Sequence, residues 1–189
     1  MGRRLFAALA LTFFARGASI RTVDFKNFSY PFLNTKYISV PSRPRWMPLV
    51  GTARVPLRDS RYTFACDYPP CRLITFDQVV FGKLDGLGEV AIPTTVFHTG
   101  GTANWEYLYV IAMRSGRPKV IAWLEAGSRA DMGLRRAAVD HGDLVLVLND
   151  PDKREGDCCS NGSVTLRYRW INGSFQQFGK SIRADDPPR

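Results

Sequence analysis

The chain has 189 residues, of which 45% are hydrophobic and 12% aromatic, and its formal net charge is +9. This composition excludes a largely disordered protein and suits one domain with a sizeable core. Only two histidines are present, which limits acid–base schemes of catalysis.

The N-terminus has the three regions of an export signal. "MGRR" is positively charged, "LFAALALTFFA" is an apolar run of eleven residues, and small residues flank a cut after Gly17 or Ala18. That run is too short to span a membrane, and no later segment has the roughly 20 apolar residues that a span requires. A buried or amphipathic helix is the alternative. We predict a signal peptide over residues 1–18 and an exported protein, periplasmic or extracellular, with 23 basic and 17 acidic residues, a net charge of +6.

The segment from Ser19 to about Ser60 is rich in aromatic residues and then in prolines. Five aromatic residues precede Pro41, and two further prolines follow by position 48. Closely spaced prolines disfavour a helix. We therefore expect an extended arm that packs across an edge of the sheet.

Runs rich in β-branched and aromatic residues follow, and turn signals separate them. The Asp85–Gly86 pair ends the first run, and Asn172–Gly173 is the strongest hairpin signal in the chain. One weak helix, a turn or two within 128–138, is expected. The predicted strands span residues 71–84, 89–97, 105–113, 119–127, 134–139, 144–150, 164–170 and 174–178.

The run "VTLRYRW" alternates cleanly between apolar and polar residues. Leu166, Tyr168 and Trp170 share one face, which we expect to meet a core. Successive hairpins predict a mostly β fold, an antiparallel meander that forms a sandwich or a partly closed barrel. We predict a single β-rich domain over 19–182 and a flexible tail over 183–189.

The four cysteines lie in turn-rich contexts, Cys66 and Cys71 in "CDYPPC" and Cys158 and Cys159 in "GDCC". An even number of cysteines in an exported chain favours disulfides. Three pairings are possible, and we prefer one that joins the two segments. It would close a loop of roughly 90 residues and stabilise the fold by about 4 to 5 kcal/mol, more than a local bond. An all-cysteine zinc site or free thiols are the alternatives.

The stretch "GKLDGLGEVAI" is similar in layout to a calcium loop. Such loops place carboxylates at alternate positions and a glycine at the sharp turn. Lys83 and Leu87 occupy two of the three alternate positions, so only Asp85 and the nearby Glu89 supply carboxylates. We predict a hairpin turn here, and no metal or other cofactor for the protein.

Basic residues are dispersed along the chain, with no run of five and no nucleic-acid recognition motif, so we expect no specific nucleic-acid binding. The candidate surface patch consists of Arg135, Arg136, Arg167 and Arg169, and a solvated sheet face is the alternative. A basic patch favours weak, salt-sensitive association with an anionic envelope component. Another exported protein is the second candidate partner.

The histidines and carboxylates of the sequence form no specific catalytic motif. His98 in "HTGGT" is typical of a hairpin loop, and no nucleophile elbow, Walker loop or dinucleotide motif is present. His141 in "DHGD" has Asp140 and Asp143 beside it, a pattern that also makes a good turn. A carboxylate pair for glycoside hydrolysis could be drawn from residues such as Glu125, Asp131 and Asp140.

Five motifs occur in order over most of residues 22–178: "VDFKNFSYPF", "VVFGKLDGLGEVAIP", "GSRADMGLRR", "DCC" and "LRYRWINGSF". In these motifs the chain resembles a family of small exported bacterial proteins that have no known activity. The resemblance implies the fold and the compartment. In that family the turn at 82–88 is closer to Gly-Asp-Leu-x-Gly-Asp-Gly, from which Lys83 and Leu87 depart. A second loop of the family has a "GDRADGG"-like pattern, which Gly127, Arg129, Asp131 and Gly133 match.

The sequence favours a non-catalytic binding or cell-envelope structural module over an enzyme. The alternative function is a hydrolase that uses a carboxylate pair, or His141 with Asp140 or Asp143. A deep pocket lined by such residues would favour the hydrolase, and a closed core with shallow surfaces would favour the module.

Overall fold

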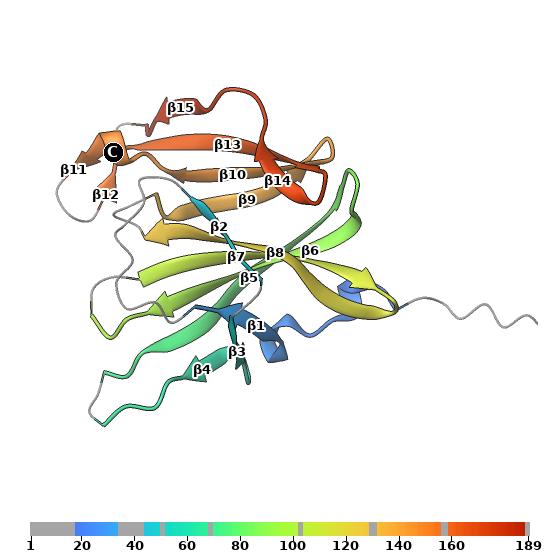
Figure 1. Ribbon diagram of the computed structural model, residues 1–189. Helices are drawn as coiled ribbons and strands as arrows, with labels where there is room; N and C mark the ends of the chain where they lie inside the picture. Colours follow the sequence, from blue (N-terminus) through green and yellow to red (C-terminus); the bar gives the residue numbers. More distant parts are fainter. Residues whose placement is uncertain are drawn as a thin grey trace, which may run out of the picture.

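The computed structural model describes most of the chain, namely residues 18–33, 44–49, 52–67, 70–101, 104–128, 132–155 and 159–187, with only the backbone at 154, 155 and 159. Antiparallel strands dominate these residues and form two stacked sheets (Figure 1). The predicted fold class is confirmed: the described part is a sandwich of hairpins and not a closed barrel. It contains no helix long and apolar enough to cross a membrane. The predicted signal peptide lies, up to residue 17, outside the described residues.

The larger sheet contains the central meander. Its strands lie in the order β2-β8-β7-β6-β5-β4 (Figure 1). Hairpin turns join β5 to β6 and β7 to β8, as the turn signals predict. The strands are β2 (Arg45–Met47), β4 (Arg61–Thr63), β5 (Leu73–Leu84), β6 (Gly88–His98), β7 (Asn104–Arg114) and β8 (Arg117–Ser128).

The smaller sheet has the order β14-β13-β10-β9, and β15 also pairs with β13. The predicted hairpin at Asn172–Gly173 is confirmed: Ile171 pairs with Ser174, and both turn residues have positive φ, 49° and 84°. The strands are β9 (Leu134–Asp140), β10 (Asp143–Asn149), β13 (Gly162–Ile171), β14 (Ser174–Gln177) and β15 (Ile182–Asp185).

Two predictions about local structure need correction. The weak helix over 128–138 is not formed in its described part, because residues 134–138 belong to β9 and pair with β10. Residues 183–185, predicted as the start of a flexible tail, belong to β15 and pair with β13. In both places cross-strand pairing prevails over weak local preference.

The core between the two sheets is mainly aliphatic. The predicted alternation of β13 is confirmed, since Leu166 and Tyr168 are buried in this core and Trp170 packs against it. The most buried aliphatic members are Val90, Ile92, Leu108, Val110, Ala112, Leu124, Leu144, Leu146 and Leu148.

The N-terminal arm covers the other face of the larger sheet (Figure 1). Tyr30 packs on Tyr109 with ring centroids 4.6 Å apart, and the Tyr109 hydroxyl donates a hydrogen bond to the Pro31 carbonyl. The prediction that the arm packs across a sheet edge is therefore wrong for this part, because its large rings need a face to be buried; β2 does lie at an edge. The arm comprises η1 (Ile20–Thr22), η2 (Phe25–Asn27), β1 (Ser29–Phe32) and β3 (Ala53–Pro56).

One side of the sandwich is closed by close contact between β5 and β9. A Cβ on Gly82 would lie 2.4 Å from the Cβ of Val139, so only glycine allows this approach. Beyond it, the turn after β5 meets the turn before β10, where the Asp85 N–H donates to the Gly142 carbonyl over 2.9 Å (Figure 1). We call this contact region the closed side.

The cysteine pairing differs from the one we preferred. Cys66 is joined to Cys71, with the Cα atoms 5.6 Å apart, in the loop between β4 and β5. A cysteine forms one disulfide, so the long-range link from this loop to the second cysteine segment is wrong. Cys158 lies outside the described residues, as does the Cys159 side chain on β12 (Cys159–Ser160), which pairs with β11 (Arg154–Glu155) after η3 (Pro151–Lys153).

Candidate functional site

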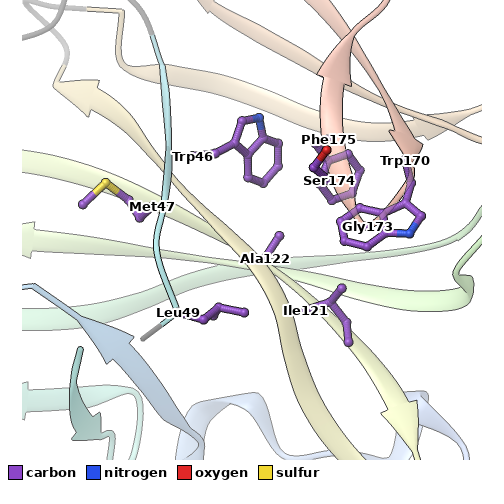
Figure 2. Close-up of a pocket in the computed structure, with 9 residues that line it drawn as sticks. All are labelled: Trp46, Met47, Leu49, Ile121, Ala122, Trp170, Gly173, Ser174 and Phe175. Atoms are coloured by element: carbon purple, nitrogen blue, oxygen red, sulfur yellow. The ribbon is translucent and has the colours of Figure 1, made fainter. Parts of the chain in front are cut away.

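The side of the sandwich opposite the closed side holds a groove of about 240 Å³ (Figure 2). Three segments that are distant in the sequence form it: β2, the middle of β8, and the β13–β14 hairpin. Apolar side chains predominate in its lining, polar atoms also contribute to its surface, and the one side-chain hydroxyl donates to the Ile171 carbonyl. The lining residues are Trp46, Met47, Leu49, Ile121, Ala122, Trp170, Gly173, Ser174 and Phe175.

Aromatic packing fixes the upper wall of the groove. Trp46 stacks on Phe175, with ring centroids 4.5 Å apart and planes 11° apart, and Trp170 packs edge-on against the same phenylalanine. In Figure 2 the indole nitrogen of Trp46 lies on the side away from Ala122. The groove therefore presents more carbon than polar surface to a ligand, and burial of its apolar area would contribute about 25 cal/mol per Å².

The floor of the groove exists because β2 is short. β2 pairs with residues 123–125 of β8 and ends at Met47, and Pro48, which has no N–H for a further ladder bond, follows. Ile121 and Ala122 therefore lie beyond the reach of β2 on this edge. Leu49 remains 44% exposed at the groove mouth.

The four arginines of the candidate patch lie at two places on the smaller sheet. Arg167 and Arg169, on β13, make ion pairs at the end where β10 begins. Arg135 lies at the other end, where it donates to Asp186 and to the Gly162 carbonyl. Arg136 is exposed on β9, opposite Val147. Three of the four are therefore engaged in contacts within the protein.

The ion pairs of β13 involve both aspartates of the "DHGD" turn. Arg167 Nη2 lies 2.5 Å from Asp140 Oδ2, and Arg169 Nε lies 2.8 Å from Asp143 Oδ1. The hydrogen bond from Arg167 holds the pKa of Asp140 below its usual value, and that from Arg169 does the same for Asp143. Neither carboxyl group is suited to act as a general acid near neutral pH.

His141 lies in the turn between these aspartates and points into solvent. Its side chain is 90% exposed, and its Nδ1 is 2.7 Å from Asp140 Oδ1. The φ of His141 is 48°, which fits the predicted turn. The groups of the hydrolase scheme, His141 with Asp140 or Asp143, thus lie in one turn. However, this turn is exposed, and both aspartates are paired with arginines.

The stretch that is similar to a calcium loop is the turn between β5 and β6, as predicted. Leu84 pairs with Gly88, and the Asp85 carboxylate lies against Gly142, where an added Cβ would be within 2.5 Å of it. Glu89 pairs with Arg21 of the N-terminal arm over 2.7 Å. Among the described residues, no three His, Cys, Asp or Glu side chains are grouped to hold a metal ion.

His98 ends β6, and a loop leads from it to β7, as predicted. Its Nε2 lies 3.0 Å from the Thr75 hydroxyl and its Nδ1 lies 3.1 Å from Asn104 Oδ1. Both ring nitrogens therefore have partners on neighbouring strands. These contacts fix the ring against the sheet.

Glu106 is a carboxylate that our sequence reasoning missed. It lies on β7, on the face shared with Leu108, and accepts a hydrogen bond from the Leu134 N–H at the start of β9. Burial, with a smaller contribution from the charge of Asp77, raises its pKa to about 7 against the lowering effect of that N–H. Asp77 accepts a hydrogen bond from Thr94 over 2.9 Å. A charged residue in register with Leu108 and Val110 was the signal that could have revealed it.

Of the carboxylates considered for a hydrolase, Glu125 is buried on β8. Arg45 Nη2 lies 3.8 Å from Glu125 Oε1, and the Tyr107 hydroxyl donates to the same carboxylate. Burial raises the pKa of Glu125, and Arg45 opposes the shift. Asp131 lies outside the described residues. Glu125 thus fastens β2 to β8 and does not line the groove.

No protein-family model, no curated protein and no solved structure matches the chain.

Proposed function

We propose that this protein is an exported, non-catalytic binding module of the cell envelope, and that the groove holds its ligand. The observation that carries the proposal is a mainly apolar groove beside a stretch of sheet edge that no described strand pairs with. Contiguous exposed apolar surface on a folded domain commonly marks an interaction site. The Cys66–Cys71 bond supports the compartment, because disulfides persist mainly in oxidising environments.

The groove is a better contact than the basic patch. Arg135, Arg167 and Arg169 already satisfy carboxylates of the same chain, so a ligand would have to compete with these pairs. The net positive charge still favours approach of an anionic partner, with a salt-sensitive rate. Charge therefore steers the partner, and the apolar groove retains it.

The hydrolase alternative has one supporting observation, which is the pair formed by Glu106 and Asp77. A glutamate whose pKa is raised to about 7 by burial, with a contribution from a second carboxylate, is a common arrangement for general acid catalysis. Glu106 already accepts from a backbone N–H, and it is not among the groove residues. The binding module is therefore the function that the geometry supports best.

The proposal is tested by titrating the protein with 1-anilinonaphthalene-8-sulfonate, a fluorescent probe of apolar surface. We expect one saturable site in the native protein and at least tenfold weaker binding after Ile121→Glu. Ile182→Glu is the matched control, because Ile182 is 66% exposed on β15 and the charge change is the same. Equal loss in both variants, or in neither, would reject the groove as the binding site.

A further inference from the structure

The edge of β8 is only partly paired. On the side away from β7, β2 pairs with residues 123–125, and no described strand pairs with residues 117–122. The other side of this stretch is paired with β7, with a β-bulge at Ile121, because Val120 pairs with Ile111 and Ala122 pairs with Val110. An unpaired strand edge carries free N–H and C=O groups, which can form a ladder with a further strand.

The groove lies directly beside this unpaired stretch. Ile121 and Ala122 belong to both, and Trp170 and Phe175 of the β13–β14 hairpin form the opposite wall (Figure 2). An extended segment on the edge would point alternate side chains to one face. One of those side chains would enter the groove, so the ladder and the apolar contact are available to the same ligand.

The charge of the edge indicates the chemistry of that segment. Arg117 and Lys119 are exposed on the unpaired stretch, and neither is in an ion pair with a described residue. Lys119 pairs with Ala112, which is buried between the two sheets, so Lys119 lies on the groove face of β8. A segment with a carboxylate next to its apolar residue would complement this edge.

A second copy of the chain fits this edge poorly. Antiparallel pairing of two β8 edges would bring the basic residues of both copies close together, and like charges across a ladder are destabilising. β2 also occupies the adjoining part of the same edge in each copy. A partner segment of opposite charge avoids both obstacles.

We infer that the protein binds an extended peptide segment of another protein, which adds as a strand to residues 117–122 of β8 and places a large apolar side chain, next to an acidic residue, in the groove. This inference rests on the proposed function and specifies its ligand. Pro118 on this edge has no N–H, so the ladder depends on the residues between Lys119 and Ala122.

The experiment is a selection of random linear peptides displayed on phage, with the full-length protein as the target. We expect enriched peptides to carry Asp or Glu beside an aromatic or large aliphatic residue. Their affinity should fall at least tenfold with Ile121→Glu and with Lys119→Glu, but not with Lys180→Glu, an exposed lysine of the chain that is not on β8. Peptides N-methylated at alternate amides should bind at least tenfold more weakly, and hydrogen exchange at Lys119–Ala122 should slow at least tenfold on binding.

Other results would overturn the inference. Enriched peptides that tolerate N-methylation, or that bind the Ile121→Glu variant equally well, would exclude strand addition at this edge. No enrichment, with saturable binding of the fluorescent probe retained, would reject the peptide and leave the groove as a site for another apolar ligand. Two further outcomes apply if no peptide is enriched. A concentration-dependent dimer that is lost in Ile121→Glu would assign the groove to a second copy of the chain. Binding to phosphatidylglycerol vesicles that is lost in Ile121→Glu would assign the groove to lipid. If the native protein bound neither the fluorescent probe nor any peptide, the proposed function itself would be rejected.

Discussion

The two sides of the sandwich are built in opposite ways. On the closed side, Gly82 lets the Val139 side chain of β9 lie directly on the backbone of β5, and the two neighbouring turns are hydrogen-bonded. On the side of the groove, β2 is short, so no described strand pairs with part of the β8 edge, and mainly apolar side chains line a groove there.

The difference separates positions that hold the fold from positions that are available for binding. A protein interior is close-packed, so an atom added at a contact with no spare volume forces the neighbouring groups to move and strains the fold. A groove has volume to spare, so its more exposed residues, such as Leu49, can change with little effect on the fold. We therefore expect large changes in stability from the closed side and large changes in binding from the groove.

The sharpest test of the closed side is Gly82→Val. The new Cβ would lie within 2.4 to 2.9 Å of three side-chain carbons of Val139, so β5 and β9 must separate. Overpacking of this kind costs about 3 kcal/mol. Chemical denaturation should show the loss as a lower midpoint.

Gly101→Val is the matched control for that substitution. An added Cβ there has no heavy atom closer than 3.8 Å, and Gly101 is exposed. We expect a change of less than about 0.5 kcal/mol. If Gly82→Val proved equally mild, the tight closure of this side would be wrong.

Glu106→Gln examines the start of β9, at the other end of this strand from Val139 and the closed side. Burial and Asp77 place the pKa of Glu106 at about 7, above its ordinary 4.5, so the folded state favours the protonated form. The free energy of unfolding should then be unaffected by this group below about pH 4.5 and should fall as the pH rises from about 4.5 to 7. Glutamine keeps an acceptor for the Leu134 N–H without the charge.

The expected result is that Glu106→Gln matches the native protein at pH 4 and exceeds its stability at pH 8 by about 2 to 3 kcal/mol. Thermal denaturation at both pH values measures the difference. Glu89→Gln, an exposed glutamate on the same sheet, controls for the loss of one negative charge. A gain that is independent of pH would show that Glu106 does not titrate in this range.

The sequence predicted those features that depend on neighbours along the chain. The alternation around Leu166 and Tyr168 and the turn at Asn172–Gly173 each follow from a few adjacent residues, and both are confirmed. β9 shows the limit: "LRRAA" has good helix formers, yet its residues pair with β10 and its end packs on Gly82. That contact is set by tertiary structure, so no local pattern reveals it.

The groove could not be predicted for the same reason. Trp46, Ile121 and Phe175 are far apart in the sequence and meet only because β2 reaches the β8 edge beneath the β13–β14 hairpin. The prediction of one free arginine patch did not include the ion pairs of Arg167 and Arg169, because sequence spacing does not show that Asp140 and Asp143 are their partners. The resemblance to exported bacterial proteins and the signal peptide stay predictions.

The disulfide lies in neither the closed side nor the groove, and we expect its effect on stability to be intermediate. The bond between Cys66 and Cys71 closes a short loop, for which the chain-entropy relation gives about 2 kcal/mol, less than half of what the long-range link would contribute. We expect Cys66→Ala with Cys71→Ala to lower the free energy of unfolding by that amount at most. A loss of 4 kcal/mol or more, measured by denaturation, would contradict the local role of this bond.

The smallest expected effect on stability comes from the groove, with Leu49→Ser. Leu49 is 44% exposed, so its removal takes little apolar area out of the folded core, and the free energy of unfolding should change by less than about 0.5 kcal/mol. Binding of the fluorescent probe should still weaken, because the mouth of the groove loses apolar surface. Denaturation and probe titration on the same sample measure both quantities. A stability loss comparable to that of Gly82→Val, with unchanged probe binding, would mean that Leu49 serves the fold, and the distinction between the two sides would not hold.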